Sequence, residues 1–248
     1  MRTRTGLMVA LTLALSASAA QAETWTVTSL GWQPFSGADL KKQGAGIHAL
    51  RTALDTVGVD LKVKFMPWKR AKGVARNNPN VVGYYPSWPS EVVDGFFASQ
   101  TVFKSPVGFA ETESRPIDWQ KPSDLADHRV GTVGAYIYPE SFQKLVDSGD
   151  ISTVEARDDA TALRMLKDDR VDTVAIDKYV MRYHLNTNPA LKGFGDQVSF
   201  DDKALVNYDL VLAFADNAEN RERAKTLKKA LGNVDTQQII ADYLQGLK

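Results

Sequence analysis

The sequence predicts an α/β fold of two lobes, each a mostly parallel sheet flanked by helices, with two strand crossings between the lobes. Short apolar runs alternate with helix-period segments over residues 105–179, which is typical of βαβ units. A similar order of strands and helices precedes this unit at residues 25–85. The strand and helices that follow, at residues 206–247, are too few for a core of their own, so we expect them to pack back on the first section.

The first section reads as a strand–helix series closed by turn residues. Its first strand runs into a segment rich in Gly, Pro and Ser at residues 31–37, and Gly58 ends the helix that follows. Residues 61–65 alternate apolar and charged side chains with the period of a strand. The expected elements are strands at 25–30, 61–65 and 81–85 and helices at 47–57 and 69–76.

The middle section predicts a second sheet. Ligands of such parallel sheets bind outside the carboxyl ends of the strands. Gly134–Tyr136 and Asp177 follow two of these ends, so they are the first candidates for a site. The expected elements are strands at 106–110, 129–133, 151–154 and 171–177 and helices at 139–147 and 158–167.

The last section predicts a long strand at residues 206–214 and a helical tail with a break at Gly232 and Asn233. Packing of this section on the first gives a discontinuous lobe 1, residues 23–108 with 204–248, and a lobe 2, residues 109–203. Two crossings with a cleft between them are the geometry of a hinge.

Residues 1–22 are typical of a cleavable signal peptide. Arg2 and Arg4 precede an apolar run at residues 7–15, and residues 20–22 form a small-residue cleavage site. A periplasmic location is therefore expected. The chain has no Cys, which excludes a lipid-anchored lipoprotein, disulfides and Cys-based metal sites.

Charge and motifs exclude several other classes. The 30 basic and 30 acidic residues balance and are scattered, so nucleic acid is not an expected partner. His48, His128 and His184 share no metal-ligand spacing, and neither a phosphate loop nor a nucleophile motif is present. The short run around Gly44 and Gly46 predicts only a close approach of chains. We expect no metal and no cofactor.

The order and spacing of several segments are similar to a known family. Together they resemble the family-3 solute-binding proteins of bacterial ABC transporters, which are amino-acid-type, type II periplasmic binding proteins; the branch is a divergent one. The resemblance implies a non-enzymatic, monomeric binder of a small molecule, with an inner-membrane ABC permease as partner. The segments are residues 32–35, 67–71, 96–99, 124–134, 170–177 and 240–244.

The resemblance also implies site residues. Trp32 takes the place of an aromatic ring that stacks on the ligand. Gly134, Ala135 and Tyr136 take the place of a loop that receives the ligand carboxylate, and Asp177 that of a carboxylate that pairs with the ligand amino group.

The departures from the family pattern concern the ligand carboxylate. Glu91 stands where the family has an arginine clamp, and the aromatic residues Tyr84 and Trp88 stand in a run of small hydroxyl residues. Arg70 or Arg115 could supply the missing cation. A Glu91 that faces the cleft would favour a cationic ligand group.

Alternatives remain for each reading. Half or more of the aromatic residues, Trp68 among them, could pack in the hinge and core, and Tyr85 is expected in the core because strand alternation turns it away from Tyr84. Asp177 could simply cap a helix. The chain could also be a periplasmic enzyme similar to cyclohexadienyl dehydratases, with Glu91 or Asp177 as general acid, or an accessory or sensor protein.

Overall fold

The computed structural model describes residues 23–134, 136–201 and 203–246. The strands are β1 (Glu23–Ser29), β2 (Val59–Phe65), β3 (Gly83–Ser87), β4 (Phe96–Ala98), β5 (Phe103–Thr112), β6 (Arg129–Val133), β7 (Ser152–Ala156), β8 (Thr173–Asp177), β9 (Val198–Phe200) and β10 (Val206–Ala215). The α-helices are α1 (Ala45–Asp55), α2 (Trp68–Asn77), α3 (Glu140–Asp147), α4 (Asp159–Lys167), α5 (Lys178–Thr187), α6 (Ala218–Leu231) and α7 (Thr236–Gln245).

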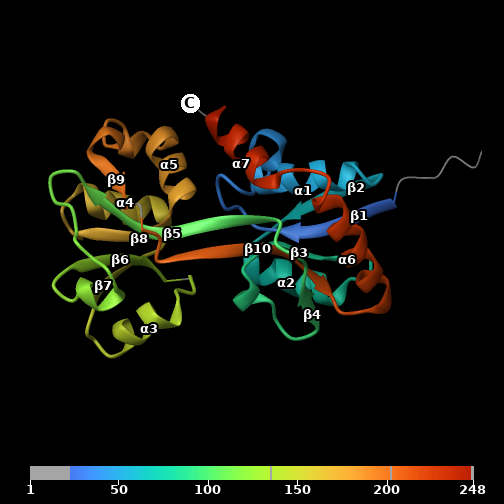
Figure 1. Ribbon diagram of the computed structural model, residues 1–248, viewed down its shortest axis with the longest axis horizontal. Coiled ribbons are helices and arrows are strands. Elements are labelled where there is room, and N and C mark those ends of the chain that lie inside the picture. The colour runs from blue at the N-terminus through green and yellow to red at the C-terminus, as the bar shows by residue number, and fades with distance from the viewer. Residues whose placement is uncertain (1–22, 135, 202, 247–248) are drawn as a thin grey trace, which may run out of the picture.

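Two lobes lie side by side, which confirms the predicted α/β architecture (Figure 1). Lobe 1 holds β1 to β4 with α1, α2, α6 and α7, and lobe 2 holds β6 to β9 with α3, α4 and α5. The long strands β5 and β10 run through both. The exact lobe boundaries given above stay a prediction, because these strands continue from one lobe into the other without a loop.

The sheet of lobe 1 has β1 at its centre, parallel to β2 on one side and β3 on the other. The end of β10 and the short β4 extend it in the antiparallel sense. Alternation along β3 sends Tyr85 into the core beside α1, where its hydroxyl donates to the carbonyl of Gly46, while Tyr84 packs with Ala75 of α2. The predicted core position of Tyr85 is confirmed.

The sheet of lobe 2 has β6 between β7 and β8, all three parallel. Because the strands are parallel, their carboxyl ends meet at one edge. Val133, Ala156 and Asp177 end the three strands, and the segments that follow them carry the polar and aromatic side chains of the site. The core of this lobe includes Phe109 and Phe142, both fully buried.

The two predicted crossings are one antiparallel ribbon. Residues 103–107 of β5 pair with residues 206–210 of β10. Further along, β5 pairs with β8 of lobe 2, and β10 pairs with β3 of lobe 1. Two strands with a continuous ladder hold the lobes together yet leave each free to twist about them, which is a hinge geometry.

The helices follow the predicted order with small shifts. The expected helix at 69–76 is α2, and the helical tail divides into α6 and α7 around Gly232 and Asn233, as predicted. The strand expected at 81–85 lies two residues later, at β3, and the short strands β4 and β9 were not predicted because three residues give no pattern. Helices α6 and α7 pack against α1.

Gly44 precedes the first residue of α1 and has a backbone conformation that favours glycine. Its φ is +104°, and a Cβ at this position would lie 2.6 Å from the carbonyl oxygen of Phe35. The amide of Gly46 donates to the same carbonyl at 2.9 Å. The close approach that the sequence predicts for this run is therefore confirmed, and it fixes the turn that carries Trp32.

Candidate ligand-binding cleft

Two adjoining cavities lie where the lobes meet at the hinge strands. The outer cavity measures about 130 Å³ and the inner one about 10 Å³, and they share Trp32, Trp88 and Tyr136 in their walls. Lobe 1, lobe 2 and β10 all contribute side chains, so the cleft crosses between the lobes. The outer cavity also reaches Trp68, Glu91 and Leu210, and the inner one reaches Asp159, Asp177 and Tyr208.

Trp88 is the centre of the aromatic walls. Its ring meets Trp32 edge-on with centroids 6.0 Å apart and Tyr136 of lobe 2 edge-on at 5.8 Å. Tyr208 of β10 stacks on it at 4.5 Å. Edge-to-face and stacked pairs at these separations are favourable arrangements of aromatic rings. The walls of the two lobes therefore meet through aromatic contacts.

Asp177 ends β8 and caps α5. Its Oδ1 accepts hydrogen bonds from the amides of Tyr179 at 2.6 Å and Val180 at 2.9 Å, and its Oδ2 accepts one from the hydroxyl of Ser105 on β5. Burial raises the pKa of Asp177 to about 7, against the opposing effect of these three bonds. The capping role foreseen as an alternative is thus present, and both carboxylate oxygens are already satisfied.

Asp159 is a second acid in the inner cavity. It is the first residue of α4, after the helix cap Asp158, and only 6% of it is exposed. Its Oδ2 accepts a hydrogen bond from the Tyr136 hydroxyl at 2.5 Å, whereas its Oδ1 has no partner among the described residues. Burial raises the pKa of Asp159 to about 6, because the charged form loses its solvation.

Glu91 lines the outer cavity but is already paired. Its Oε2 accepts a hydrogen bond from the indole of Trp68 at 2.5 Å and forms an ion pair with Lys72 of α2 at 3.1 Å. The carboxylate is therefore neutralised from within lobe 1, so it is not the free charge that its sequence position suggested.

Basic side chains are absent from the described part of the cavity walls. Of the described residues that line either cavity, none is Lys or Arg. Arg70 is exposed on α2, and Arg115 pairs with Asp169 and Asp172 on the outside of lobe 2. Neither arginine lines the cleft, so neither replaces the arginine clamp that this chain lacks.

The other predicted site residues lie at varied distances from the cavities. Tyr84 is fully buried below them, and its hydroxyl donates to the carbonyl of Glu91 at 3.0 Å. Gly134 is exposed and lines neither cavity; a Cβ there would overlap the carboxyl group of Glu155. Ala135 lies outside the described residues. Trp32, Trp88, Tyr136 and Asp177 do come together, and their role as ligand contacts stays a prediction.

Two residues of the cleft, Asp159 and Tyr208, are not among the candidate site residues predicted from the sequence. Asp159 follows Asp158, and such a pair reads as the acidic first turn of a helix. Tyr208 lies in the long last strand. The alternation of side chains along that strand predicts which face of the sheet Tyr208 lies on, but it does not predict which residues of the other lobe it contacts. The position of Asp159 just after a strand of a parallel sheet was the available clue.

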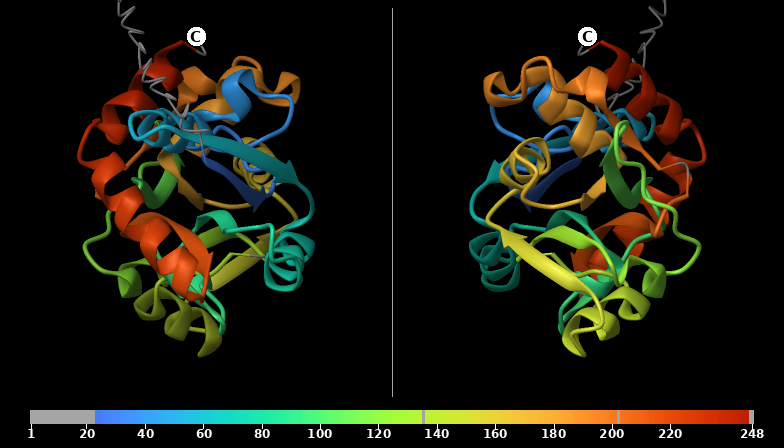
Figure 2. Two further views of the ribbon diagram at one scale, coloured as in Figure 1. Left: turned by 90° about the vertical axis from the view of Figure 1, so that its right-hand side faces the viewer. Right: turned by 90° about the vertical axis from the view of Figure 1, so that its left-hand side faces the viewer.

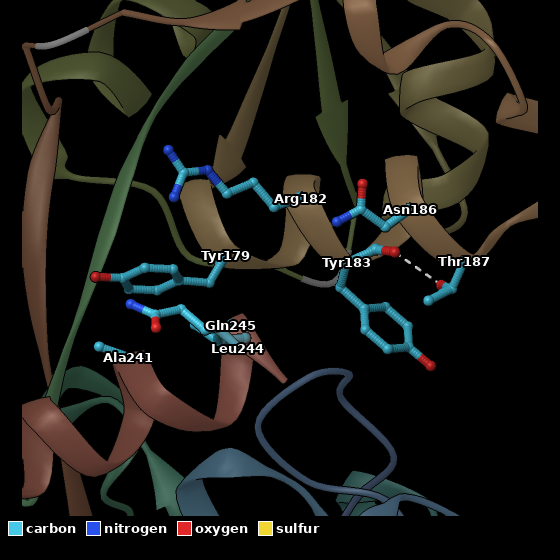
Figure 3. Close-up of a pocket in the computed structure, with 8 residues that line it drawn as sticks. All are labelled: Tyr179, Arg182, Tyr183, Asn186, Thr187, Ala241, Leu244 and Gln245. Carbon is cyan, nitrogen blue, oxygen red and sulfur yellow. Dashed lines mark hydrogen bonds between the residues drawn. The ribbon is translucent and has the colours of Figure 1, made fainter. Parts of the chain in front are cut away.

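A separate groove lies between α5 and α7 (Figure 3). It measures about 330 Å³, and Figure 3 shows Tyr179 of α5 beside Gln245 of α7. The groove is larger than the cleft, but its described walls hold no acidic side chain, whereas those of the cleft hold Asp159 and Asp177, so the cleft is the stronger candidate for a ligand site. Its walls are Tyr179, Arg182, Tyr183, Asn186, Thr187, Ala241, Leu244 and Gln245.

Among the described residues, no group of three or more His, Cys, Asp or Glu side chains is placed to hold a metal ion. Within the same part of the chain, every helix is too short or too polar to cross a membrane.

Comparison with known proteins finds likeness in structure alone. No family model and no curated protein matches the chain. Among solved structures, the GluR0 ligand-binding core in complex with L-glutamate matches with a TM-score of 0.68 and 16% identity, over 91% of this chain and 98% of that one. A Streptococcus pneumoniae amino acid ABC transporter substrate-binding protein, AbpA bound to L-arginine, matches with a TM-score of 0.65 and 18% identity, over 90% and 95%.

A third match has a different setting. The periplasmic VFT2 domain of Bordetella pertussis BvgS matches with a TM-score of 0.66 and 15% identity, over 92% of this chain and 95% of that domain. Matches of this coverage show the fold: the chain has the two-lobed fold of the type II periplasmic binding proteins. The resemblance derived from the sequence is confirmed at this level.

Proposed function

We propose that this protein is a periplasmic solute-binding protein that captures a small polar ligand, amino-acid-like or cationic, between its lobes and delivers it to an ABC permease. The observation that carries the proposal is the cleft, whose walls come from lobe 1, lobe 2 and β10 together. The likeness to AbpA, a substrate-binding protein of an amino acid ABC transporter, supports the transport role.

The proposed mechanism is a population shift. A ligand that touches Trp88 of lobe 1 and Tyr136 of lobe 2 gains its full set of contacts only when the lobes are closed. It therefore binds the closed state more tightly and draws the equilibrium towards it. The permease would recognise the closed form, and residues 1–22 would direct export before cleavage.

A sensor role is the second candidate, and the likeness to the VFT2 domain of BvgS favours it. The cleft would then bind the same class of ligand, but closure would signal to a partner other than a permease. Reconstitution of transport with the permease separates the two: a transporter component stimulates uptake of its ligand, and a sensor does not. Turnover of a prephenate-like compound by the purified protein would instead support the enzyme alternative.

The test of ligand capture is a thermal-shift screen. The protein without residues 1–22 is unfolded and refolded to remove carried-over ligand, then mixed with amino acids, amines, betaines, small carboxylates and aromatic acids. A ligand at 100 times its Kd adds about 2.7 kcal/mol, which raises Tm by about 5–10 °C for a chain of this size. X-ray scattering on the hits should show a smaller radius of gyration. The absence of a hit in every class would contradict the proposed function.

A further inference from the structure

Asp159 presents an unsatisfied acceptor to the cleft. The residue is nine-tenths buried and lines the inner cavity, and its Oδ1 has no hydrogen-bond partner among the described residues. Buried polar atoms are rarely left unpaired, because an unmade hydrogen bond there costs stability. A hydrogen-bond donor on a ligand would satisfy this atom.

The charges around this atom are of one sign. Asp177 lines the same cavity, and the walls described above include no lysine or arginine. Lys72 is near the outer cavity, but it is held by Glu91. A ligand that enters this cavity therefore meets two acids and no opposing cation.

The faces of the aromatic rings select in the same direction, while the indole N–H groups of Trp32 and Trp88 in these walls have no hydrogen-bond partner among the described residues and remain donors for an acceptor on the ligand. Trp32, Trp88, Tyr136 and Tyr208 surround the inner cavity. The faces of such rings carry negative potential and attract cations, most strongly where water is excluded. An aromatic enclosure next to a buried acid is thus complementary to an ammonium group.

We propose that Asp159 anchors the ammonium group of the ligand, and that this ligand is a small protonated amine without a carboxylate. The inference rests on the proposed capture function and names its ligand class. The ammonium donates a hydrogen bond to Oδ1 of Asp159, while Oδ2 keeps its bond from Tyr136. Asp177, with both oxygens occupied by Ser105 and the start of α5, adds charge without a direct bond.

An amino acid fits the same cavity poorly. The inner cavity of about 10 Å³ has room for little more than the ammonium group. The carboxylate of an amino acid would therefore lie in the outer cavity, whose described walls hold no lysine or arginine to neutralise it, and an unpaired buried charge is costly. The free carboxylate of Asp159 and the missing basic partner thus discriminate between an amine and the amino acid of the same skeleton.

The test uses pairs of compounds that differ by one carboxylate: isopentylamine and leucine, cadaverine and lysine, agmatine and arginine, phenethylamine and phenylalanine. Calorimetric titration of the refolded protein at pH 7.5 gives the Kd of each. The proposal expects at least one amine to bind at least about tenfold more tightly than its amino acid, because the extra carboxylate has no basic partner in the described walls.

The outcomes of this titration distinguish a failure of the amine inference from a failure of the proposed capture function. Amino acids that bind as well as or better than their amines overturn the inference and leave the proposed capture function standing. Binding of a ligand from another class in the wider screen, with no amine bound, does the same. No binding by any compound overturns both.

A pair of variants locates the anchor. Asp159→Asn removes the carboxylate charge at nearly constant shape. It should weaken amine binding at least about tenfold, because the buried ammonium group of the ligand loses its charged partner. Asp127→Asn is the matched control, because Asp127 is an exposed residue of the same lobe. Equal losses in both variants, or no loss in Asp159→Asn, contradict the proposal.

A second measurement covers the case in which Asp159→Asn fails to fold. Alkylamines stay protonated from pH 5 to 8, so a change of affinity in this range reports the protein. The titratable groups that line the two cavities are Asp159, Asp177, Glu91, Tyr136, Tyr138 and Tyr208. Amine affinity should fall at least about fivefold from pH 8 to pH 5 as the buried acids take up protons. A constant affinity over this range overturns the inference.

Discussion

The ring of Tyr208 stacks on the ring of Trp88 with centroids 4.5 Å apart and planes 19° apart. Trp88 belongs to lobe 1, and Tyr208 belongs to β10. The hydroxyl of Tyr208 also donates to the carbonyl of Ile137 in lobe 2 at 2.8 Å. One side chain of the hinge ribbon thus contacts both lobes, so opening the cleft must break at least one of these contacts.

Tyr208→Phe tests this bridge. The variant keeps the stacking ring and loses the bond to Ile137, so we expect the free energy of unfolding to fall by about 1 kcal/mol. We also expect a larger mean radius of gyration without ligand, measured by X-ray scattering, because closure loses a contact. Tyr85→Phe is the control, because it loses one buried hydroxyl bond, to the carbonyl of Gly46, that lies within lobe 1. An unchanged radius in Tyr208→Phe would contradict the bridging role.

The pH dependence of stability should carry the signature of Asp159. Burial raises its pKa in the folded state to about 6, above the ordinary value of 3.8, so its charged form opposes folding. This destabilisation is complete above pH 7 and is relieved as the pH falls through 6 towards 4. Two pKa units correspond to about 3 kcal/mol. We expect Asp159→Asn to be more stable than the parent chain at pH 7.5, and the difference to vanish near pH 4.

Other groups titrate in the same range, so only the difference between the two chains is informative. Burial lowers the pKa values of His48 and His184, so these residues make the folded state less stable as the pH falls. Asp159 has the opposite effect on the free energy of unfolding. Denaturant unfolding of both chains at pH 4, 5, 6 and 7.5 cancels these terms. A constant difference across the series would show that Asp159 is not buried in its charged form.

Glu91→Gln should affect ligand binding little. The Glu91 carboxylate is paired with Lys72 and Trp68, so its removal leaves the charge of the inner cavity unchanged. We expect ligand affinity to change by less than about threefold, since a partly exposed ion pair contributes about 0–1 kcal/mol. Titration of the same ligand with both chains measures it. A loss of tenfold or more would return Glu91 to the role that its sequence position suggested.

Gly44→Ala should destabilise the fold more than Gly58→Ala. Both glycines have positive φ, but a Cβ at Gly44 would lie 2.6 Å from the backbone of Phe35, whereas a Cβ at Gly58 meets nothing within 4 Å. We expect about 1 kcal/mol for the strained φ alone at Gly58 and at least about twice that at Gly44. Thermal unfolding of the two variants compares them directly, and equal losses would contradict the close packing at the start of α1.

The sequence predicts the fold better than the site for a physical reason. Hydrophobic periodicity and turn residues are local signals, and they locate the strands, the hinge crossings and the break between α6 and α7. Strand alternation also separates Tyr84 from Tyr85 correctly. The short strands β4 and β9 escape because a strand of three residues pairs through tertiary contact alone.

The site depends on contacts between distant segments, which no local pattern encodes. Asp177 was found because it ends an apolar strand, but the bonds that occupy it come from Ser105 and α5. Asp159 looks like an ordinary helix-start acid until the fold brings Tyr136 to it. Lys72, one turn along α2 from Trp68, neutralises Glu91 only because the helix packs beside it.

The width of the groove between α5 and α7 should change when the lobes close, so it offers a way to measure closure. Figures 1 and 2 place α5 and α7 on one side of the hinge ribbon and α2 and α3 on the other. When the lobes rotate about the ribbon, the gap between them narrows on one side and widens on the other. The chain has no cysteine, so Asn186→Cys and Gln245→Cys give the only thiols for a pair of dyes. Their energy transfer should fall when a ligand closes the cleft, without a label near the site.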